Sequence, residues 1–296
     1  EEINMYEDMP QRHVQDLMMK LLYKNQPAGW NIAGEKKNIL KMKRPDFVNY
    51  KKMHYLPEAT VLVISGQVEE KKVLKEVNRV FGHIPRGKKV GKIKTKDVQS
   101  HPEALIKWKS TDQTHFVLGM RSYDFFNKKS SALSVLSGIL GGGMSSRLFQ
   151  KLREEMGVGY YVRAYNDAFT DHGFLQISAG VDNKRIYEVL KAVIKECNIL
   201  KNKLVGREEL EKVKEYLIGN MKLSLESSDD IANFYGGQEL LKKELKNIEE
   251  KAREIRHVSS KKIRALARDI FQDKKLNLAI IGPFKEKKSF LKILKF

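Results

Sequence analysis

Histidine side chains have the clearest potential for metal chemistry in this chain, because a catalytic zinc ion usually needs three protein ligands and one water. The chain has seven histidines, and none of them lies in a His-Glu-x-x-His or a His-x-x-Glu-His motif. His13 and Asp16 are three residues apart and would share one helix face, but two ligands are too few for a zinc site. We therefore interpret His13 as a surface residue and find no complete zinc site in the sequence.

A run of three glycines, Gly141, Gly142 and Gly143, could also serve chemistry, because bare backbone can approach a ligand closely. This glycine run does not follow a strand in a βαβ unit, so it is a poor phosphate-binding loop. It is typical of the end of one helix and a sharp turn into the next, with Ser145 as the cap of the second helix. The functional alternative is that the glycine run lies against a bound peptide.

The elements that must position these residues follow from the spacing of the apolar side chains. Helices are predicted at residues 1–24 with a break at Pro10, 45–55, 69–81, 128–140, 145–156, 185–200, 207–225, 229–243 and 260–271. Strands are predicted at residues 60–65, 104–109, 114–121, 160–166, 173–180 and 276–281. The two hairpin-like pairs at 104–121 and 160–180 predict an α+β fold with a largely antiparallel sheet packed against helices.

One helix–strand–helix pattern occurs twice in the sequence. The apolar strands at residues 61–66 and 277–282 both end in glycine, and a segment rich in Lys and Glu follows each of them. We interpret the repeat as two homologous domains, although two common βα units can also resemble each other by chance. Residues 1–95 are then the C-terminal part of a first, incomplete domain plus a basic linker, and residues 96–296 are the second domain.

Composition and charge exclude several classes of protein. The chain has 296 residues, its only cysteine is Cys197 in an apolar helical stretch of the core, and no apolar run approaches the roughly 20 residues of a membrane span. The net charge is +19, but basic residues often alternate with glutamate, and the densest basic segment, 86–96, lacks aromatic residues that stack on bases. We expect no membrane partner, no nucleic-acid partner and, because no secretory signal is present, a cytoplasmic location.

Residues 140–181 contain the most specific pattern in the chain. It consists of Gly-Gly-Gly-x-Ser-Ser-Arg-Leu at 141–148, Leu-Arg at 152–153, Gly-Tyr at 159–160 and Gly-Phe-Leu-Gln-Ile-Ser-Ala-Gly at 173–180. This pattern resembles the C-terminal domain of the insulinase/pitrilysin family of zinc peptidases, the M16 peptidases, and most closely its bacterial processing-peptidase-like members. The opening segment, residues 1–10, also resembles the helix that follows the zinc motif in that family.

The resemblance implies a zinc-dependent endopeptidase that acts on peptides or unfolded segments. In that family a His-x-x-Glu-His motif supplies two zinc ligands and the general base, and a later glutamate supplies the third ligand. The resemblance places this third ligand at Glu2, with its neighbour Glu1 as the alternative. Without the resemblance, Glu2 would be read as an acidic residue that favours the first turn of a helix.

Arg153 and Tyr160 match an arginine and a tyrosine with which the family holds its peptide substrate. A guanidinium and a phenol can both donate hydrogen bonds to a peptide carbonyl or to the oxyanion that develops on it. The alternative is a surface Arg153 paired with Glu154 or Glu155 and a Tyr160 in the core. The resemblance also implies that the glycine run shapes the chamber wall and that a peptide binds as an added strand at a sheet edge.

The zinc motif itself is absent from this chain, and the resemblance places it upstream of Glu1. We therefore expect the Zn²⁺ ion to be held mainly by residues outside the chain, and we expect the chain alone to be inactive. One explanation is that the chain is part of a longer peptidase, which its start without methionine and its incomplete first domain favour. The other is a non-catalytic scaffold that works with a separate catalytic subunit, as a homodimer or heterodimer.

Overall fold

The computed structural model describes residues 1–241 and 244–296, which form two compact units. The sheet unit contains Glu1–Glu35, Lys94–Leu217 and Ala252–Phe296, and the helical unit contains Lys36–Ile93 and Ile218–Lys251. Residues 1–35 thus belong to the same unit as residues 94–217 and 252–296. The two homologous domains, with a boundary near residue 95, stay a prediction.

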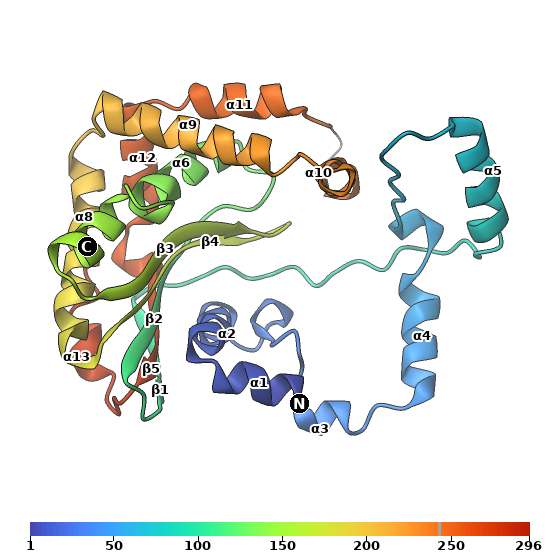
Figure 1. Ribbon diagram of the computed structural model, residues 1–296. Coiled ribbons are helices and arrows are strands. Elements are labelled where there is room, and N and C mark those ends of the chain that lie inside the picture. The colour runs from blue at the N-terminus through green and yellow to red at the C-terminus, as the bar shows by residue number, and fades with distance from the viewer. Residues whose placement is uncertain (242–243) are drawn as a thin grey trace. The chain divides into compact units, whose positions relative to one another are not determined.

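A five-stranded sheet forms the centre of the sheet unit (Figure 1). Its strand order is β1-β5-β2-β4-β3, with β1 (Glu103–Trp108), β2 (Gln113–Arg121), β3 (Gly159–Ala168), β4 (Gly173–Asp182) and β5 (Leu276–Gly282). β1 and β5 run parallel, and the other neighbouring pairs are antiparallel. The predicted α+β fold with a largely antiparallel sheet is confirmed.

The first of the two predicted hairpins is wrong. β1 and β2 follow one another in the sequence, but β5 lies between them, and Ala279 of β5 pairs with both Leu105 and Val117. All seven residues of β5 are buried, as expected for a central strand that is covered on both faces. The second hairpin, β3 with β4, is confirmed by their antiparallel register.

Three helices cover one face of the sheet (Figure 1). They are α6 (Ser130–Gly141), α8 (Ile186–Asn202) and α12 (Ser260–Ile270). The buried residues of α8 recur every three or four positions, as a helix that packs on a core requires; they are Ile186, Val189, Leu190, Val193, Ile194, Cys197 and Leu200. Cys197 is fully buried, so its interpretation as a core residue is confirmed.

The N-terminal helices α1 (Glu2–Asp8) and α2 (Pro10–Tyr23) are separated at Met9, which confirms the break predicted at Pro10. α2 lies against the sheet face opposite to α8 and α12 (Figure 1). α2 can lie this close to β2 because Gly119 of β2 has no side chain. A Cβ atom at Gly119 would lie 2.6 Å from the sulfur of Met18 in α2. Both faces of β2 and β5 are therefore covered.

Residues 145–156 form a short α-helix and a π-helical segment instead of the single helix predicted. α7 (Arg147–Phe149) leads directly into the π-helical segment Gln150–Glu155. The residue before α7 is Ser146, not Ser145, and its hydroxyl donates to the carbonyl oxygen of Gly143 at 2.5 Å. Short π-helical insertions occur frequently at functional sites.

The described residues of the helical unit form no strand. Its helices are α3 (Lys36–Ile39), α4 (Arg44–His54), α5 (Glu70–Phe81) and α10 (Ser228–Leu241); the last two residues of the helix predicted at 229–243 lie outside the described residues. The strand predicted at 60–65 is wrong for this structure. A strand needs a hydrogen-bonded neighbour, and no described segment pairs with these residues.

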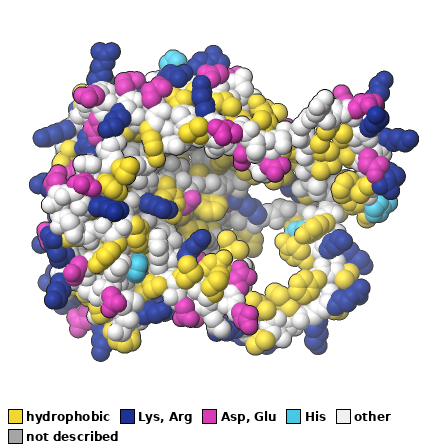
Figure 2. Space-filling model, viewed as in Figure 1, with side chains coloured by type: hydrophobic (Ala, Val, Ile, Leu, Met, Phe, Trp, Pro, Cys, Tyr) yellow, Lys and Arg dark blue, Asp and Glu magenta, His cyan; other side chains and the backbone are white. Residues whose placement is uncertain are grey.

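The remaining helices are α9 (Arg207–Leu223), α11 (Ile248–Arg256) and α13 (Lys288–Leu291). None of the helices in the described ranges is long and apolar enough to cross a membrane. Figure 2 shows acidic and basic side chains interspersed over the visible face of the sheet unit. This mixture agrees with the interpretation of the charged runs as solvated helix faces.

Candidate functional site

The glycine run lies at the C-terminal end of α6, where the helix meets the main chain of β3. A Cβ atom at Gly141 would lie 2.4 Å from the nitrogen of Ala164, and one at Gly142 would lie 2.8 Å from the Cα of Gly138. Gly142 has an ordinary helical φ of −81°, so its backbone conformation does not require glycine. These two glycines are needed because backbone packs directly on backbone.

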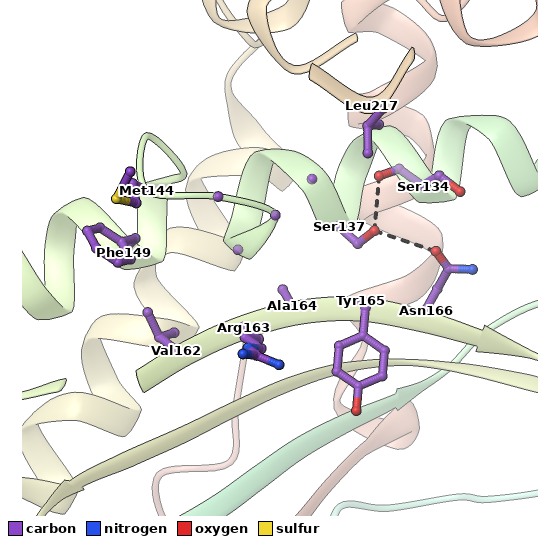
Figure 3. A pocket seen from close by; sticks show the side chains of 14 residues that line it. Ser134, Ser137, Met144, Phe149, Val162, Arg163, Ala164, Tyr165, Asn166 and Leu217 are labelled. Atoms are coloured by element: carbon purple, nitrogen blue, oxygen red, sulfur yellow. Dashed lines mark hydrogen bonds between the residues drawn. The ribbon is translucent and has the colours of Figure 1, made fainter. Parts of the chain in front are cut away.

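A pocket of about 530 Å³ opens between the end of α6 and β3 (Figure 3). Bare backbone and apolar side chains form most of its wall, and they include the glycine run, Met144, Phe149 of α7, Val162 of β3 and Leu217 of α9. Arg163 is the one charged residue among those that line it. Because most of the wall is apolar, the pocket is suited to a largely apolar group.

The other polar groups of the pocket, apart from Arg163, are neutral. The Ser137 hydroxyl donates to the Ser134 carbonyl oxygen at 3.0 Å and lies 3.5 Å from Oδ1 of Asn166. Figure 3 shows Asn166 pointing toward α6 and Tyr165 pointing away from it. Burial and, to a smaller extent, the charge of Asp167 raise the pKa of Tyr165, so its phenol stays protonated at neutral pH.

Arg153 lies beside the pocket. It is exposed on the π-helical segment, and its guanidinium carbon lies 5.3 Å from the centroid of the Phe149 ring. Because Phe149 also lines the pocket, this cation–π contact fixes Arg153 close to the pocket wall. Glu155, one of the alternative partners of Arg153, pairs with Lys151 at 2.5 Å.

Tyr160 lies at the start of β3 and is 60% exposed, so the alternative of a core tyrosine is wrong. It is the extra residue of a β-bulge, because Gly159 pairs with Val181 while Tyr161 already pairs with Gly180. A bulge redirects a side chain and is common next to active sites. Arg153 and Tyr160 are therefore both open to a ligand; that they bind one stays a prediction.

Arg147, which the sequence pattern did not single out, begins α7 next to the glycine run. Its Nε and Nη2 donate to Oε1 and Oε2 of Glu209 at 2.7 and 2.8 Å, and the carboxylate of Glu196 lies 3.9 Å away. The hydrogen bond to Glu209 raises the pKa of Arg147, which keeps the pair charged. The pair fixes the loop that follows the glycine run. Local spacing gave no signal for it, because its partners are far away in the sequence.

Glu2 lies in the first turn of α1 and is exposed. Across residues 1–241 and 244–296, no group of three His, Cys, Asp or Glu side chains could hold a metal ion. One exposed carboxylate is not a zinc site, so the described residues do not by themselves fit the ion. Glu2 as a zinc ligand stays a prediction.

His13 is buried, which corrects its interpretation as a surface residue. It is 9% exposed, and its Nε2 lies 3.2 Å from the ammonium of Lys107. Burial and the charge of Lys107 lower the pKa of His13. The neutral ring therefore accepts a hydrogen bond from Lys107 and belongs to the packing of α2 on the sheet.

Comparison with known proteins places this fold and pattern in a family. The family model described as "Peptidase M16 inactive domain" matches residues 41–217, which is more than half of the chain. An uncharacterized zinc protease of Bacillus subtilis is 32% identical over 284 residues, which cover 96% of this chain and 68% of that protein. An uncharacterized zinc protease of Streptomyces coelicolor is 28% identical, with 98% and 64% covered. The chain thus spans about two thirds of the length of these relatives.

Solved structures share the fold. A protease from Helicobacter pylori matches with a TM-score of 0.85 and 20% identity, over 93% of this chain and 67% of that chain. A peptidase M16 inactive domain from Pseudomonas fluorescens matches with a TM-score of 0.86 and 21% identity, over 96% and 68%. The resemblance carried by residues 140–181 is confirmed, and the chain belongs to the M16 peptidase family.

Proposed function

We propose that this chain is the substrate-holding part of a zinc-dependent endopeptidase that acts on peptides or unfolded segments. Its curated relatives are named zinc proteases, and it spans about two thirds of their length. Within the chain, the observation that carries the proposal is the pocket between the glycine run and β3, with exposed Arg153 stacked on Phe149 of its wall and exposed Tyr160 at the start of β3. The zinc ion would be held mainly by residues outside the chain, and Glu2 would contribute one carboxylate.

In this proposal Arg153 and Tyr160 hold the peptide. The guanidinium and the phenol are hydrogen-bond donors, and a peptide main chain offers them a carbonyl oxygen at every residue. The exposure of both side chains leaves them free to reach a ligand. The glycine run shapes the pocket wall, since any side chain at Gly141 would meet β3.

The two homologous domains belong to the same proposal. Residues 60–65 are apolar and unpaired in the described structure, with Val61, Leu62 and Ile64 exposed by 38%, 52% and 46%. The matching segment of the repeat is β5, the central strand of the sheet unit. We infer that residues 60–65 hold the position in the first domain that β5 holds in the second.

A second candidate is a scaffold that keeps the fold and performs no hydrolysis. The family model that matches the chain is described as an inactive domain, and this observation favours the scaffold. Such a chain would work beside a subunit that carries the zinc motif, in a homodimer or a heterodimer.

Purification of the full-length protein separates the two candidates. The peptidase is expected to contain one zinc ion per chain and to cleave an unstructured fluorogenic peptide at internal bonds, with activity lost on addition of a chelator. The scaffold is expected to lack zinc and to support cleavage only when a motif-bearing subunit is added. Failure of both assays would contradict both candidates. Cell fractionation tests the cytoplasmic location, which is part of the same proposal.

A further inference from the structure

Arg153 lies on a segment that the rest of the chain must hold in place. The π-helical segment Gln150–Glu155 contains it, and its side chain is exposed. A long arginine side chain has many rotamers in solvent, and fixing one of them costs free energy when a ligand binds. The cation–π contact with the Phe149 ring reduces this freedom, so the direction of Arg153 depends on where Phe149 lies.

Three consecutive residues of α7 determine where the Phe149 ring lies. Arg147 binds Glu209 of α9 through two hydrogen bonds, at 2.7 and 2.8 Å. The next residue, Leu148, is fully buried, and Phe149 lines the pocket (Figure 3). Phe149 and Arg153 are four residues apart, a spacing that places two side chains on the same face of a helix. The orientation of α7 therefore decides whether Arg153 lies beside the pocket.

The Arg147–Glu209 pair has the geometry of a strong anchor. It is bidentate, and the two side chains are only 19% and 33% exposed, so water screens this pair less than a pair on the open surface. A second carboxylate, that of Glu196 in α8, lies 3.9 Å from the same guanidinium. Loss of the bonds to Glu209 would leave Arg147 with Glu196 alone and release α7 from α9.

We propose that Arg147 is a positioning residue for Arg153: its bonds to Glu209 fix α7, and α7 holds the Arg153 guanidinium beside the pocket through Phe149. The inference rests on the proposed function, because it takes Arg153 as a residue that holds the peptide. It goes beyond that function by giving a role to Arg147 and Glu209, neither of which lines the pocket.

Hydrogen exchange in the 296-residue chain tests whether the pair fixes this segment. Three main-chain amides report on the segment, because they donate to carbonyl oxygens of residues 146, 151 and 152; they belong to Gln150, Met156 and Val158. Glu209→Gln removes the charge, while Glu196 still neutralises Arg147, so the fold should persist. We expect the three amides to exchange about tenfold faster in this variant.

Glu215→Gln is the matched control for hydrogen exchange. Glu215 also lies on α9, but its partner is the exposed Arg256, at 3.3 Å. In this control the three amides should exchange as in the unaltered chain. Exchange that stays unchanged in Glu209→Gln, or rises equally in the control, would overturn the proposal.

A double-mutant cycle in the full-length protein separates positioning from general stabilisation. Glu209→Gln alone should lower kcat/KM for cleavage of an unstructured peptide by about tenfold, with little change for Glu215→Gln. Combined with Arg153→Ala it should cause no further loss, because the side chain that it positions is then absent. An equal loss in both backgrounds would show that Glu209 supports only the fold, and would overturn the proposal.

Phe149→Leu tests the same chain of contacts without altering the ion pair. It keeps an apolar side chain in the pocket wall but removes the ring under the guanidinium. We expect about a threefold loss of kcat/KM, and again no further loss in the Arg153→Ala background. This variant decides the proposal even if Glu209→Gln does not fold, since an equal loss in both backgrounds would overturn it.

The outcomes also separate this inference from the proposed function. If Arg153→Ala impairs cleavage while the losses from Glu209→Gln and Phe149→Leu persist beside it, the inference fails and the peptidase stands. If the full-length protein cleaves nothing, or Arg153→Ala cleaves normally, the proposed function fails and the inference fails with it.

Discussion

At the scale of single residues, the candidate site depends on a glycine, because a side chain at its position would not fit. Gly141 lets α6 lie on the backbone of β3, because its absent Cβ would meet the nitrogen of Ala164. The sequence indicated a turn at this position. It could not indicate the close approach to β3, because Ala164 belongs to a different element, more than twenty residues further along the chain.

Gly141→Ala is expected to lower the free energy of unfolding by about 1–3 kcal/mol, since the added methyl group must push α6 away from β3. Gly219→Ala is the matched control, because nothing lies within 4 Å of a Cβ atom built at this position in α9. This control should raise stability by about 1 kcal/mol through helix propensity. Urea unfolding of both variants measures the two changes, and equal effects would contradict the packing described for Gly141.

Asp269 predicts a pH dependence of stability. Burial opposes its ionisation, but hydrogen bonds from Tyr123, Lys275 and Lys129 together outweigh burial and hold the pKa of Asp269 at about 2. Because this folded pKa lies below the ordinary value of 3.8, the carboxylate stabilises the fold above pH 3.8. That contribution is lost as the pH falls toward 2.

The free energy of unfolding should therefore differ between the unaltered chain and Asp269→Asn by a constant amount above about pH 5, and this difference should shrink as the pH falls. Unfolding by denaturant at a series of pH values measures the difference. A difference that does not change between neutral pH and the acid limit of folding would show that the three donors do not stabilise the ionised form.

At the scale of secondary-structure elements, local patterns predicted most helices and the β3–β4 hairpin. Local patterns gave a wrong strand pairing where the neighbour of a strand comes from a distant segment of the chain. The turn at Thr111, Asp112 and Gln113 suggested that β1 and β2 pair, but β5 arrives from the end of the chain and lies between them. All residues of β5 are buried because the strand lies in the middle of the sheet and is covered on both faces. This position is a property of the whole sheet and cannot be predicted from neighbouring residues in the sequence.

Residues 60–65 failed as a prediction for a related reason. Their β-branched and apolar residues favour a strand, but strand formation needs a partner, and the described chain supplies none. The π-helical segment Gln150–Glu155 was also not predictable, because apolar spacing alone does not distinguish it from the end of an α-helix.

The central position of β5 gives a prediction for a shortened chain. A chain that ends at Lys275 lacks β5, so β1 and β2 lose their common neighbour and the core is opened. We expect no cooperative thermal unfolding for this chain in circular dichroism. The control lacks residues 1–9, which include α1, a helix without buried residues, and it should unfold cooperatively. Cooperative unfolding of the chain that ends at Lys275 would contradict the strand order.

At the scale of the whole molecule, the family and the fold class could be predicted, but neither the sequence motifs nor the residues that the structure describes supply a complete metal site. The resemblance carried by residues 140–181 identified the family, while Glu2 belongs to no group of three possible metal ligands among the described residues. The family could be predicted from one continuous segment, but a zinc site needs ligands from several elements together.

If the proposed function is right, zinc binding should differ between this chain and a full-length protein that carries the zinc motif. By atomic emission after dialysis, the 296-residue chain is expected to retain much less than one zinc ion per molecule, and the full-length protein one. Glu2→Gln in the full-length protein should lower its zinc affinity by about tenfold to a hundredfold, since one ligand is lost. Stoichiometric zinc in the isolated chain would show that it builds a site by itself.

The central claim is that this chain holds the peptide substrate of a zinc endopeptidase through Arg153 and Tyr160. The most direct test compares kcat/KM for cleavage of an unstructured peptide by full-length Arg153→Ala and Tyr160→Phe with that of the exposed controls Arg86→Ala and Tyr55→Phe. We expect a loss of about 10²-fold for each of the first two variants, with zinc content and melting temperature unchanged, and no loss for the controls. Arg153→Ala and Tyr160→Phe enzymes that cleave the peptide as well as the unaltered protein would contradict it.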